Sequence, residues 1–254
     1  NPATEQKIGS ITLGNGTDVD QAGTAALTAF EEFSQTSKAL RLSLLLRLKS
    51  VTEARFEDLA QAMRLEMGAP ISMARSDQAD AAVGHLQGFI DALEKLEEQI
   101  TLASGDVLVR EPIGVCGLIT PWNWPMNQIV LKVVPALATG SCCILKPSEH
   151  TPISAMIYAE IIDEAGYPPG VFNLVNGDGP TVGAALSRHA DIQMMSFTGS
   201  TRAGIAVTQD AAPTVKRVTL ELGGKSPNLV FADCDLENQI TASVQECMFN
   251  SGQS

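Results

Sequence analysis

The sequence predicts an α/β fold in which helices cover both faces of a parallel sheet. From residue 113 onward, short and nearly continuous apolar runs alternate with longer helical patterns, as expected when parallel strands are buried on both faces. Before residue 99, apolar side chains recur with helical spacing. The chain of 254 residues is long enough to bury a sizeable core, and its 44% hydrophobic and 18% charged residues are ordinary for a globular protein.

Four helices are expected in the first part of the chain. Asp18 is the expected N-cap of the first. Its apolar face comprises Val19, Ala22, Ala26, Ala29, Phe30 and Phe33. The apolar face of the second comprises Leu40, Leu44, Leu45, Leu48 and Val51. The third lies around residues 59–65, and the fourth runs from about residue 71 to 98, where Gly84 and Gly88 interrupt the pattern.

A β-hairpin is expected next, because residues 101–103 and 107–109 flank the turn Ser104-Gly105-Asp106. The strands expected after it are residues 114–119, 142–145, 171–175, 194–197 and 218–221. Helices are expected between them, including residues 127–137 and 152–165.

Charge and composition exclude several classes of partner. A formal net charge of −12 disfavours nucleic acid and anionic membranes as partners. The longest apolar stretch, residues 129–145, is interrupted by Lys132, Pro135 and Gly140, so no membrane span is expected. Five cysteines, two of them adjacent, and three histidines with no Cys-x-x-Cys pair predict buried free thiols and no metal site. Free thiols indicate a reducing compartment, and we expect a cytoplasmic protein.

Ligands of parallel α/β sheets bind beyond the carboxyl ends of the strands, so the residues that follow each strand are the candidates for chemistry. Asn123 follows the first strand, between Pro121 and Pro125. These prolines stiffen the turn and allow the Asn123 amide to serve as a donor to a developing oxyanion. An asparagine in a turn is also commonly structural, and both interpretations stay open.

Lys146 and Glu149 follow the second strand. A lysine offers a donor to a nucleotide, and a carboxylate accepts hydrogen bonds from the hydroxyls of a ribose; an ordinary surface loop is the alternative. Two glycine-rich turns, residues 177–183 and 197–204, depart from the usual dinucleotide fingerprint but place glycines where a strand gives way to a helix. Glu221 ends an apolar strand, as either a general base or an ion-pair partner.

Taken together, these motifs resemble the aldehyde dehydrogenase superfamily over essentially the whole chain. The motifs that carry the resemblance are Asn1-Pro2-Ala3-Thr4, Pro121-Trp122-Asn123-Trp124-Pro125, Lys146-Pro147-Ser148-Glu149, Phe197-Thr198-Gly199-Ser200, Glu221-Leu222-Gly223-Gly224-Lys225-Ser226-Pro227 and Gly252-Gln253-Ser254. The resemblance implies a variant Rossmann-type domain that binds NAD, with NADP as an alternative. Glu149 favours NAD, because a carboxylate repels a 2′-phosphate.

The resemblance also implies residue roles. Asn123 resembles the oxyanion donor, Glu221 the base that activates water, and Lys132 a member of a proton path. The expected cofactor residues are Ile119, Thr120, Pro121, Trp122, Lys146, Ser148, Glu149, Gly179, Phe197, Thr198, Gly199, Ser200, Gly204, Glu221, Leu222 and Gly223. The expected substrate-tunnel residues are Trp124, Gln128 and Leu131.

The implied reaction is the NAD(P)-dependent oxidation of a small-molecule aldehyde to a carboxylic acid through a cysteine thiohemiacetal and thioester. The resemblance places the nucleophilic cysteine directly after Ser254, one residue beyond the given chain, which suggests either a fragment or a break at a modified cysteine. The alternatives are a CoA-acylating semialdehyde dehydrogenase and a non-catalytic nucleotide-binding fragment. Glu221 favours hydrolysis, because CoA-dependent members tend to lack a glutamate in that position.

The expected domain organisation follows from the same resemblance. Residues 1–98 and 113–222 form the cofactor domain, residues 99–112 an oligomerisation hairpin, and residues 223–254 the start of a second α/β catalytic domain. Because an isolated hairpin is marginally stable in water, a homodimer or homotetramer is expected.

Overall fold

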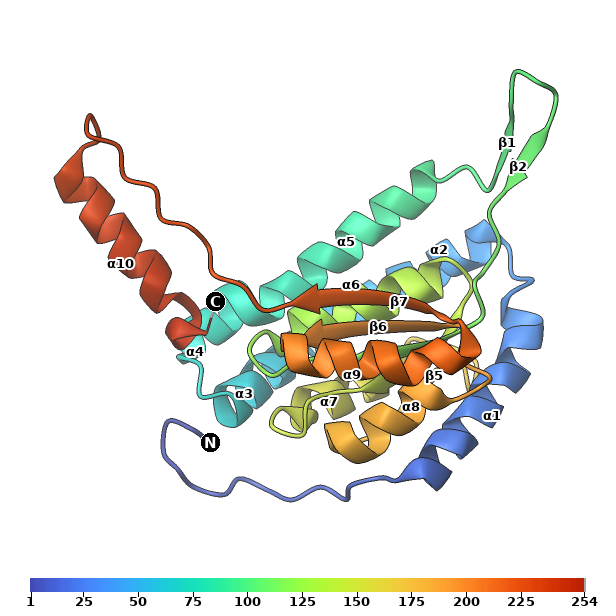
Figure 1. The fold of residues 1–254 in the computed structure, drawn as a ribbon, viewed down its shortest axis with the longest axis horizontal. Helices are drawn as coiled ribbons and strands as arrows, with labels where there is room; N and C mark the ends of the chain where they lie inside the picture. The colour runs from blue at the N-terminus through green and yellow to red at the C-terminus, as the bar shows by residue number, and fades with distance from the viewer. Residues whose placement is uncertain (254) are drawn as a thin grey trace.

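The computed structural model describes residues 1–253 and confirms the α/β class (Figure 1). Five parallel strands form the central sheet in the order β5-β4-β3-β6-β7. Their bounds are Val115–Ile119 (β3), Cys142–Lys146 (β4), Phe172–Leu174 (β5), Met194–Gly199 (β6) and Arg217–Leu222 (β7). Counted from β3, this is the order 3-2-1-4-5 of a doubly wound sheet, whose topological switch point lies between β3 and β6.

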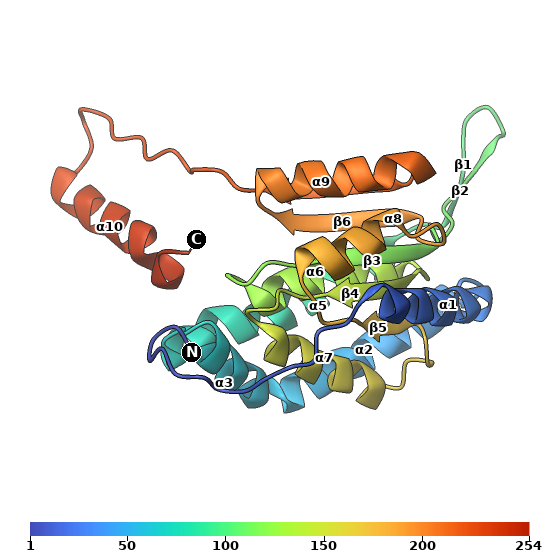
Figure 2. The same ribbon diagram turned by 60° about the horizontal axis from the view of Figure 1, so that its bottom comes forward.

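Helices cover both faces of this sheet. The helices on one face are α1 (Gly16–Phe33), α8 (Ala184–Arg188) and α9 (Thr201–Ala211), and Figure 2 shows α9 lying along β6. The helices on the other face are α6 (Pro125–Ala138) and α7 (Pro152–Glu164). The helices α2 (Lys38–Ala54), α3 (Phe56–Glu66) and α5 (Asp80–Lys95) form an outer layer that packs against α6 and α7. The core lies between these layers, and β3 and β4 are buried along their whole length.

The expected fourth helix consists of three parts. A short helix α4 (Ile71–Met73) is followed by a π-helical segment (Ala74–Ala79), and α5 begins directly after it. Gly84 and Gly88 do not break α5, because a single glycine costs a helix only about 1 kcal/mol and tertiary packing offsets it. The shorter remaining segments are a π-helix at Gly179–Gly183 and a 3₁₀ turn at Ala212–Thr214.

Two details of the first helices differ from the prediction. Asn15, not Asp18, is the N-cap of α1; its side chain accepts the Thr17 N–H at 2.8 Å, while Asp18 bonds back to the Asn15 N–H at 2.8 Å. The two residues thus form a capping box. Leu40 lies on the exposed side of α2, although Leu44 and Leu48 are buried as expected.

The β-hairpin projects away from the sheet (Figure 1). It pairs β1 (Gln99–Thr101) with β2 (Val107–Val109), so its first strand begins two residues earlier than predicted. The reason is the pairing of Thr101 with Val107, which leaves residues 102–106 as the loop; that loop is closed by a 2.8 Å bond from Leu102 N–H to the Asp106 carbonyl.

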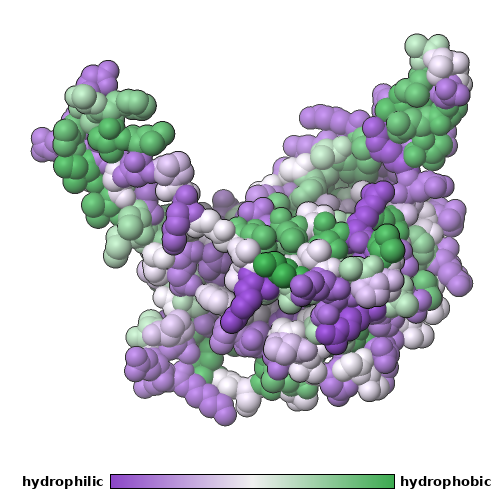
Figure 3. Space-filling model, viewed as in Figure 1, coloured by the Kyte–Doolittle hydropathy of each residue, from purple (hydrophilic) through white to green (hydrophobic). Residues whose placement is uncertain are grey.

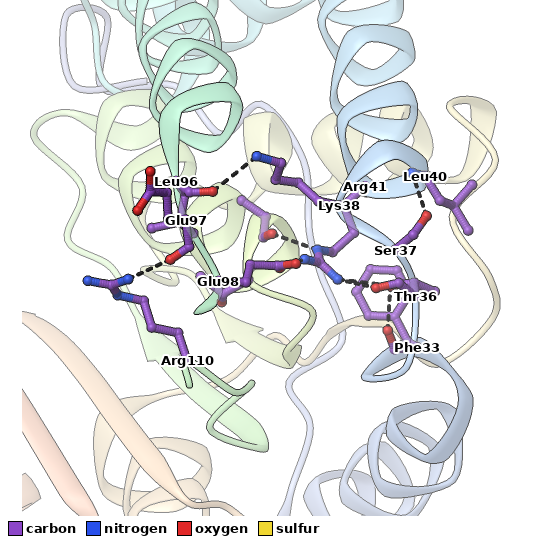
Figure 4. A network of polar contacts seen from close by, with 12 residues as sticks. Phe33, Thr36, Ser37, Lys38, Leu40, Arg41, Leu96, Glu97, Glu98 and Arg110 are labelled. Carbon is purple, nitrogen blue, oxygen red and sulfur yellow. Dashed lines mark hydrogen bonds and ion pairs between the residues drawn. The ribbon is translucent and has the colours of Figure 1, made fainter. Parts of the chain in front are cut away.

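A buried arginine fixes the base of the hairpin (Figure 4). Arg41 of α2 forms an ion pair with Glu98, just before β1, and its Nε donates to the Ala138 carbonyl of α6 at 2.9 Å. Lys38 donates to the carbonyls of Glu94 and Leu96 at 3.2 and 3.0 Å. The hairpin is therefore anchored to two helices by charge-assisted hydrogen bonds.

A second projection is made by the last helix, α10 (Leu236–Gly252), which follows an extended connection from β7 (Figure 1). Hydrophobic side chains colour both projections in Figure 3. On α10 four exposed ones are Leu236, Ile240, Val244 and Met248, with Phe249 also exposed near its end, and on the hairpin they are Leu102, Val107, Leu108 and Val109. The spacing on α10 places its four side chains along one face, so both projections present surfaces typical of an interface.

The cysteines differ in part from the prediction. Cys116, Cys142 and Cys143 are buried in β3 and β4, whereas Cys234 is half-buried and Cys247 is exposed on α10. Burial raises the pKa of the Cys116 and Cys142 thiols to about 12, which leaves them unreactive. Within residues 1–253, no helix is long and apolar enough to cross a membrane.

Candidate active site

The carboxyl ends of four neighbouring strands bring the predicted site residues to one edge of the sheet. Ile119 of β3 pairs with Lys146 of β4 and with Phe197 of β6. Thr198, also on β6, pairs with Glu221 of β7. Residues far apart in the sequence therefore meet at the switch point of the sheet, where doubly wound folds bind their ligands.

Two buried hydroxyls at this edge have no hydrogen-bond partner within residues 1–253. They are Thr120 Oγ1, directly after β3, and Thr198 Oγ1, in β6. A buried polar group without a partner is costly. Thr120 follows β3 and Thr198 lies near the end of β6, the two strands that flank the switch point, so both hydroxyls are suited to contact a polar ligand there.

Lys146 is held within the protein at the end of β4. Its Nζ donates to the carbonyls of Pro147 and Gly177 at 2.8 and 2.7 Å, and to Glu149 Oε2 at 3.3 Å. Burial lowers its pKa, and the charges of Glu149 and Asp178 oppose that shift. These three bonds engage all three ammonium hydrogens, whereas Glu149 remains exposed enough to accept bonds from a ribose.

The loop after β4 is fixed by a carboxylate that the sequence did not single out. Glu66, at the end of α3, accepts the Ile153 and Ser154 backbone N–H groups at 2.6 and 3.1 Å, and the Ser154 hydroxyl also donates to it. It thus caps the N-terminus of α7 from another helix, while Thr151, the N-cap residue itself, makes no side-chain cap. Burial raises the pKa of Glu66 to about 7.

The two glycine-rich turns both lead into helical segments. Asp178 caps the first by accepting the Thr181 N–H at 2.7 Å, and a side chain at Gly179 would meet no atom within 4 Å. Ser200 caps α9 by accepting the Ala203 N–H at 3.3 Å. The exposed N-termini of these segments present backbone N–H groups suited to an anion.

Gly204 packs against the last strand of the sheet. A Cβ at this position would lie 2.7 Å from Leu222, so the glycine lets α9 pack closely on β7. Gly223, by contrast, has open space around it: a Cβ there would meet no atom within 4 Å. Gly179 and Gly223 therefore leave room for a ligand.

Asn123 connects the end of β3 with the last described residues of the chain. Its side-chain Nδ2 donates to the carbonyl of Gln253 at 2.7 Å. An amide nitrogen carries two hydrogens, so one remains available after this bond. Beside it, Trp122 is 51% exposed and lies edge-on to His150, with ring centroids 5.4 Å apart. Pro121 lies half-buried between Thr120 and this tryptophan.

Lys132 approaches the sheet from α6. Its Nζ donates to Ser196 Oγ of β6 at 3.0 Å. Burial lowers the pKa of Lys132 to about 8, and the negative charge of Glu221 opposes the shift. A lysine with a pKa near neutrality, close to a carboxylate, is suited to hold or move a proton.

The predicted tunnel residues share one face at the start of α6. Trp124 precedes the helix, Gln128 bonds to the Trp124 carbonyl through its N–H at 3.0 Å, and Leu131 lies one turn later on the exposed side. The Trp124 and Phe249 rings lie with centroids 5.8 Å apart. This face therefore adjoins the end of α10.

The structure thus brings the predicted residues to one edge, and their individual roles stay predictions. Four residues were missed: Glu66, Gln78, Ser196 and Asn250. Ser196 lies within a predicted strand next to Phe197, and its alternation with Met195 marks it as facing one side of the sheet. No sequence pattern marks the other three, Glu66, Gln78 and Asn250, as site residues, because the residues that they bond to are remote in sequence.

Comparison with known proteins identifies the family. The family model described as "Aldehyde dehydrogenase family" matches residues 1–254. A curated relative from Pseudomonas sp, 3-succinoylsemialdehyde-pyridine dehydrogenase, is 52% identical over 255 residues, which cover 100% of this chain and 53% of the relative. The chain therefore spans about half the length of the curated relatives that it matches.

Solved structures are similar at the level of the backbone. An aldehyde dehydrogenase C variant from Pseudomonas syringae, complexed with NAD+ and octanal, has a TM-score of 0.98 at 50% identity and covers 100% of this chain and 52% of its own. The NAD+ complex of an aldehyde dehydrogenase from Bacillus cereus has a TM-score of 0.95 at 39% identity and covers 100% of this chain and 53% of its own.

Proposed function

The chain belongs to the aldehyde dehydrogenase family, and we propose that the full-length protein oxidises an aldehyde to a carboxylic acid with NAD. The observation that carries the proposal is the 2.7 Å bond from the Asn123 side chain to the Gln253 carbonyl. It joins the proposed oxyanion donor to the segment that, by family resemblance, directly precedes the nucleophilic cysteine. Covalent catalysis needs these two groups side by side.

The residues of this chain act around that cysteine. Thiolate attack on the aldehyde carbon develops negative charge on the carbonyl oxygen, and Asn123 donates its remaining amide hydrogen to that oxygen. Once the carbon is oxidised, a thioester remains, and Glu221 takes a proton from the water that hydrolyses it. Lys132, half-buried and bonded to Ser196, has a pKa lowered to about 8, so the fraction of its amine that is neutral can accept that proton from Glu221. Trp124, Gln128 and Leu131 are proposed to line the tunnel through which the aldehyde reaches the cysteine.

The proposed cofactor site fits the residues at the edge of the sheet. When bound, NAD accepts the hydride that leaves the aldehyde carbon. The two unpartnered hydroxyls of Thr120 and Thr198 are available to its polar groups. Glu149 and Lys146 are proposed to form the ribose side of the site, with Ser148 buried beneath it. The other proposed cofactor residues are Ile119, Pro121, Trp122, Gly179, Phe197, Gly199, Ser200, Gly204, Leu222 and Gly223.

Hydrolysis is favoured over transfer of the acyl group to CoA. The acid-forming reaction needs a base for water, and Glu221 lies at the end of β7, where its charge acts on the half-buried amine of Lys132. The substrate is an aldehyde with an extended chain or a semialdehyde, in keeping with the octanal complex and the semialdehyde dehydrogenase among the similar proteins.

The anchored hairpin supports a homo-oligomer. Its exposed apolar side chains and its fixed base suit an interface with a second subunit. We propose a dimer or tetramer in the cytoplasm, where the five free cysteines remain reduced. The proposed domain division is residues 1–98 with 113–222, the hairpin at 99–112, and a catalytic part from residue 223.

The proposal is tested with the full-length protein, NAD and a panel of aldehydes that includes octanal and semialdehydes, by following the absorbance of NADH. The decisive variant is Glu221→Gln. It is expected to release about one NADH per active site in a burst and then turn over slowly, because water is no longer activated. Acceleration of turnover by CoA in the wild type would favour the acylating alternative, and no NADH with any aldehyde would contradict the proposed function.

A further inference from the structure

Gln78 lies in the one stretch between α4 and α5 where the chain leaves α-helical geometry. The segment Ala74–Ala79 is π-helical, and the Asp80 N–H bonds to the Arg75 carbonyl five residues earlier. π-Helical turns are rare and occur frequently at functional sites. Gln78 is 0% exposed, so its polar side chain is turned entirely into the protein.

The Gln78 amide joins two remote segments. Its Nε2 donates to the Asn123 carbonyl at 3.1 Å and to Asn250 Oδ1 at 2.7 Å. Asn250 Nδ2 donates to the same Asn123 carbonyl at 2.7 Å. Three amides, from the π-helical turn, the turn after β3 and the end of α10, thus close a triangle of hydrogen bonds.

The burial and backbone conformation of Asn250 suit this position. It is 0% exposed and has a φ of 51°, a left-handed conformation that asparagine tolerates better than most residues. Its backbone turn kinks the end of α10 and directs the chain to Gln253, whose carbonyl accepts a hydrogen bond from the Asn123 side chain. The Asn123 backbone and side chain are therefore both held, by different partners.

We propose that Gln78 is a positioning residue for Asn123. It fixes the backbone of the turn after β3, and through Asn250 it fixes the segment that ends at Gln253. The Asn123 amide is thereby aimed before any substrate arrives. Gln78 itself contacts neither substrate nor cofactor. The inference rests on the proposed function, since it assigns Gln78 to the oxyanion site.

The geometry also explains why a glutamine occupies this place. Only a side chain with two donor hydrogens on one atom can serve the Asn123 carbonyl and Asn250 Oδ1 together. A glutamate would lose these donors, and a leucine or methionine would fill the space without bonding. Gln78→Met is therefore the exchange that removes the bonds and keeps most of the volume.

The test compares Gln78→Met with a matched control in the full-length protein. Gln87→Met makes the same exchange on the exposed side of α5, where Gln87 bonds only to Asp91. We expect Gln78→Met to slow the first hydride-transfer step by about 10- to 100-fold, as small misplacements of catalytic groups do. The dissociation constant for NAD should stay within about twofold of the wild type, as should every parameter of Gln87→Met.

A double-mutant cycle separates positioning from a general structural role. If Gln78 acts through Asn123, adding Gln78→Met to Asn123→Ala should slow hydride transfer no further. A full additional loss in the double variant would overturn the proposal, as would a Gln78→Met enzyme as fast as the wild type. A wild type that forms no NADH would instead contradict the proposed function itself.

A second variant covers the case in which Gln78→Met does not fold. Asn250→Gly removes the other amide of the triangle and keeps the left-handed backbone conformation without strain. It should show the same pattern: slower hydride transfer, unchanged NAD affinity and no additional loss in the Asn123→Ala background. Additive effects there would also overturn the proposal.

Discussion

The ammonium group of Lys132 donates a 3.0 Å hydrogen bond to the hydroxyl of Ser196. The two residues lie on α6 and β6, respectively. The bond holds a partly buried amine beside Glu221, whose charge opposes the fall in the pKa of Lys132.

Replacing Lys132 by methionine should shift the pH dependence of turnover. Methionine carries no ionisable amine, so the group that titrates near pH 8 is lost from the site. Any change in kcat near pH 8 in the wild type should therefore be absent in the variant. Steady-state rates between pH 5 and 10 for both proteins measure this difference; coincident profiles for variant and wild type would refute the proton role.

Replacing Asn123 by alanine should slow acylation by about 10²–10³-fold, the usual cost of one oxyanion donor. Affinity for NAD should be retained, because the exchange removes only the side-chain amide. Stopped-flow measurement of the first NADH formed gives the rate, and titration of tryptophan fluorescence gives the affinity. Asn127→Ala is the matched control, since Asn127 lies one turn along α6 and bonds to His85. Equal rates in the two variants would remove Asn123 from the oxyanion site.

Exchange of Glu149 for glutamine should narrow the preference for NAD over NADP. A like-charge contact at about 4 Å in a water-exposed site is worth about 1 kcal/mol, so the ratio of kcat/KM values should fall by about fivefold. The ratio should fall because kcat/KM for NADP rises, since the variant no longer repels the 2′-phosphate of that cofactor. Equal kcat/KM values for the two cofactors in the wild type would show that Glu149 does not select against the 2′-phosphate.

The buried carboxyl of Glu66 should make stability depend on pH. Its pKa rises from 4.5 to about 7 on folding, because burial disfavours the charge. The folded state thus holds the proton more tightly, and this contribution to the free energy of unfolding is present below pH 4.5 and lost as pH rises to about 7. The difference is on the order of 3 kcal/mol.

Urea unfolding at pH 5 and pH 8 tests this dependence in the full-length protein. The wild type should lose stability relative to Glu66→Gln between the two values, since glutamine does not titrate. The exposed Glu32→Gln exchange on α1 serves as the control and should follow the wild type at both. A constant difference between wild type and Glu66→Gln would mean that Glu66 is charged throughout this range.

The strand pattern could be read from the sequence because β3 and β4 are buried on both faces and must be apolar throughout. Parallel topology then places Asn123, Thr198 and Glu221 at one edge without further information. The N-cap of α1 could also have been predicted from the sequence, since Asn15-x-x-Asp18 has the spacing of a capping box.

Gln78 and Glu66 could not be predicted in the same way. The partners of Gln78 lie 45 and 172 residues away, and those of Glu66 lie 87 and 88 residues away. A single polar residue within a helical pattern carries no sign of such partners, because tertiary packing alone decides them. Lys146 was predicted only in part. Its position at the end of a strand was expected, but its hydrogen bonds to the carbonyls of Pro147 and Gly177 were not.

The π-helical turn before α5 also affects how insertions and deletions are tolerated. A π turn accommodates one more residue than an α turn, so it can absorb an inserted residue while the helices on either side keep their faces. The buried side of α5, formed by Ala82, Leu86, Ile90 and Leu93, would therefore survive the deletion of one residue between 74 and 79. A shortened chain of that kind would fold normally, yet residue 78 would no longer point at the turn after β3. Across a family, a one-residue gap at this place would mark proteins that hold that turn by other means.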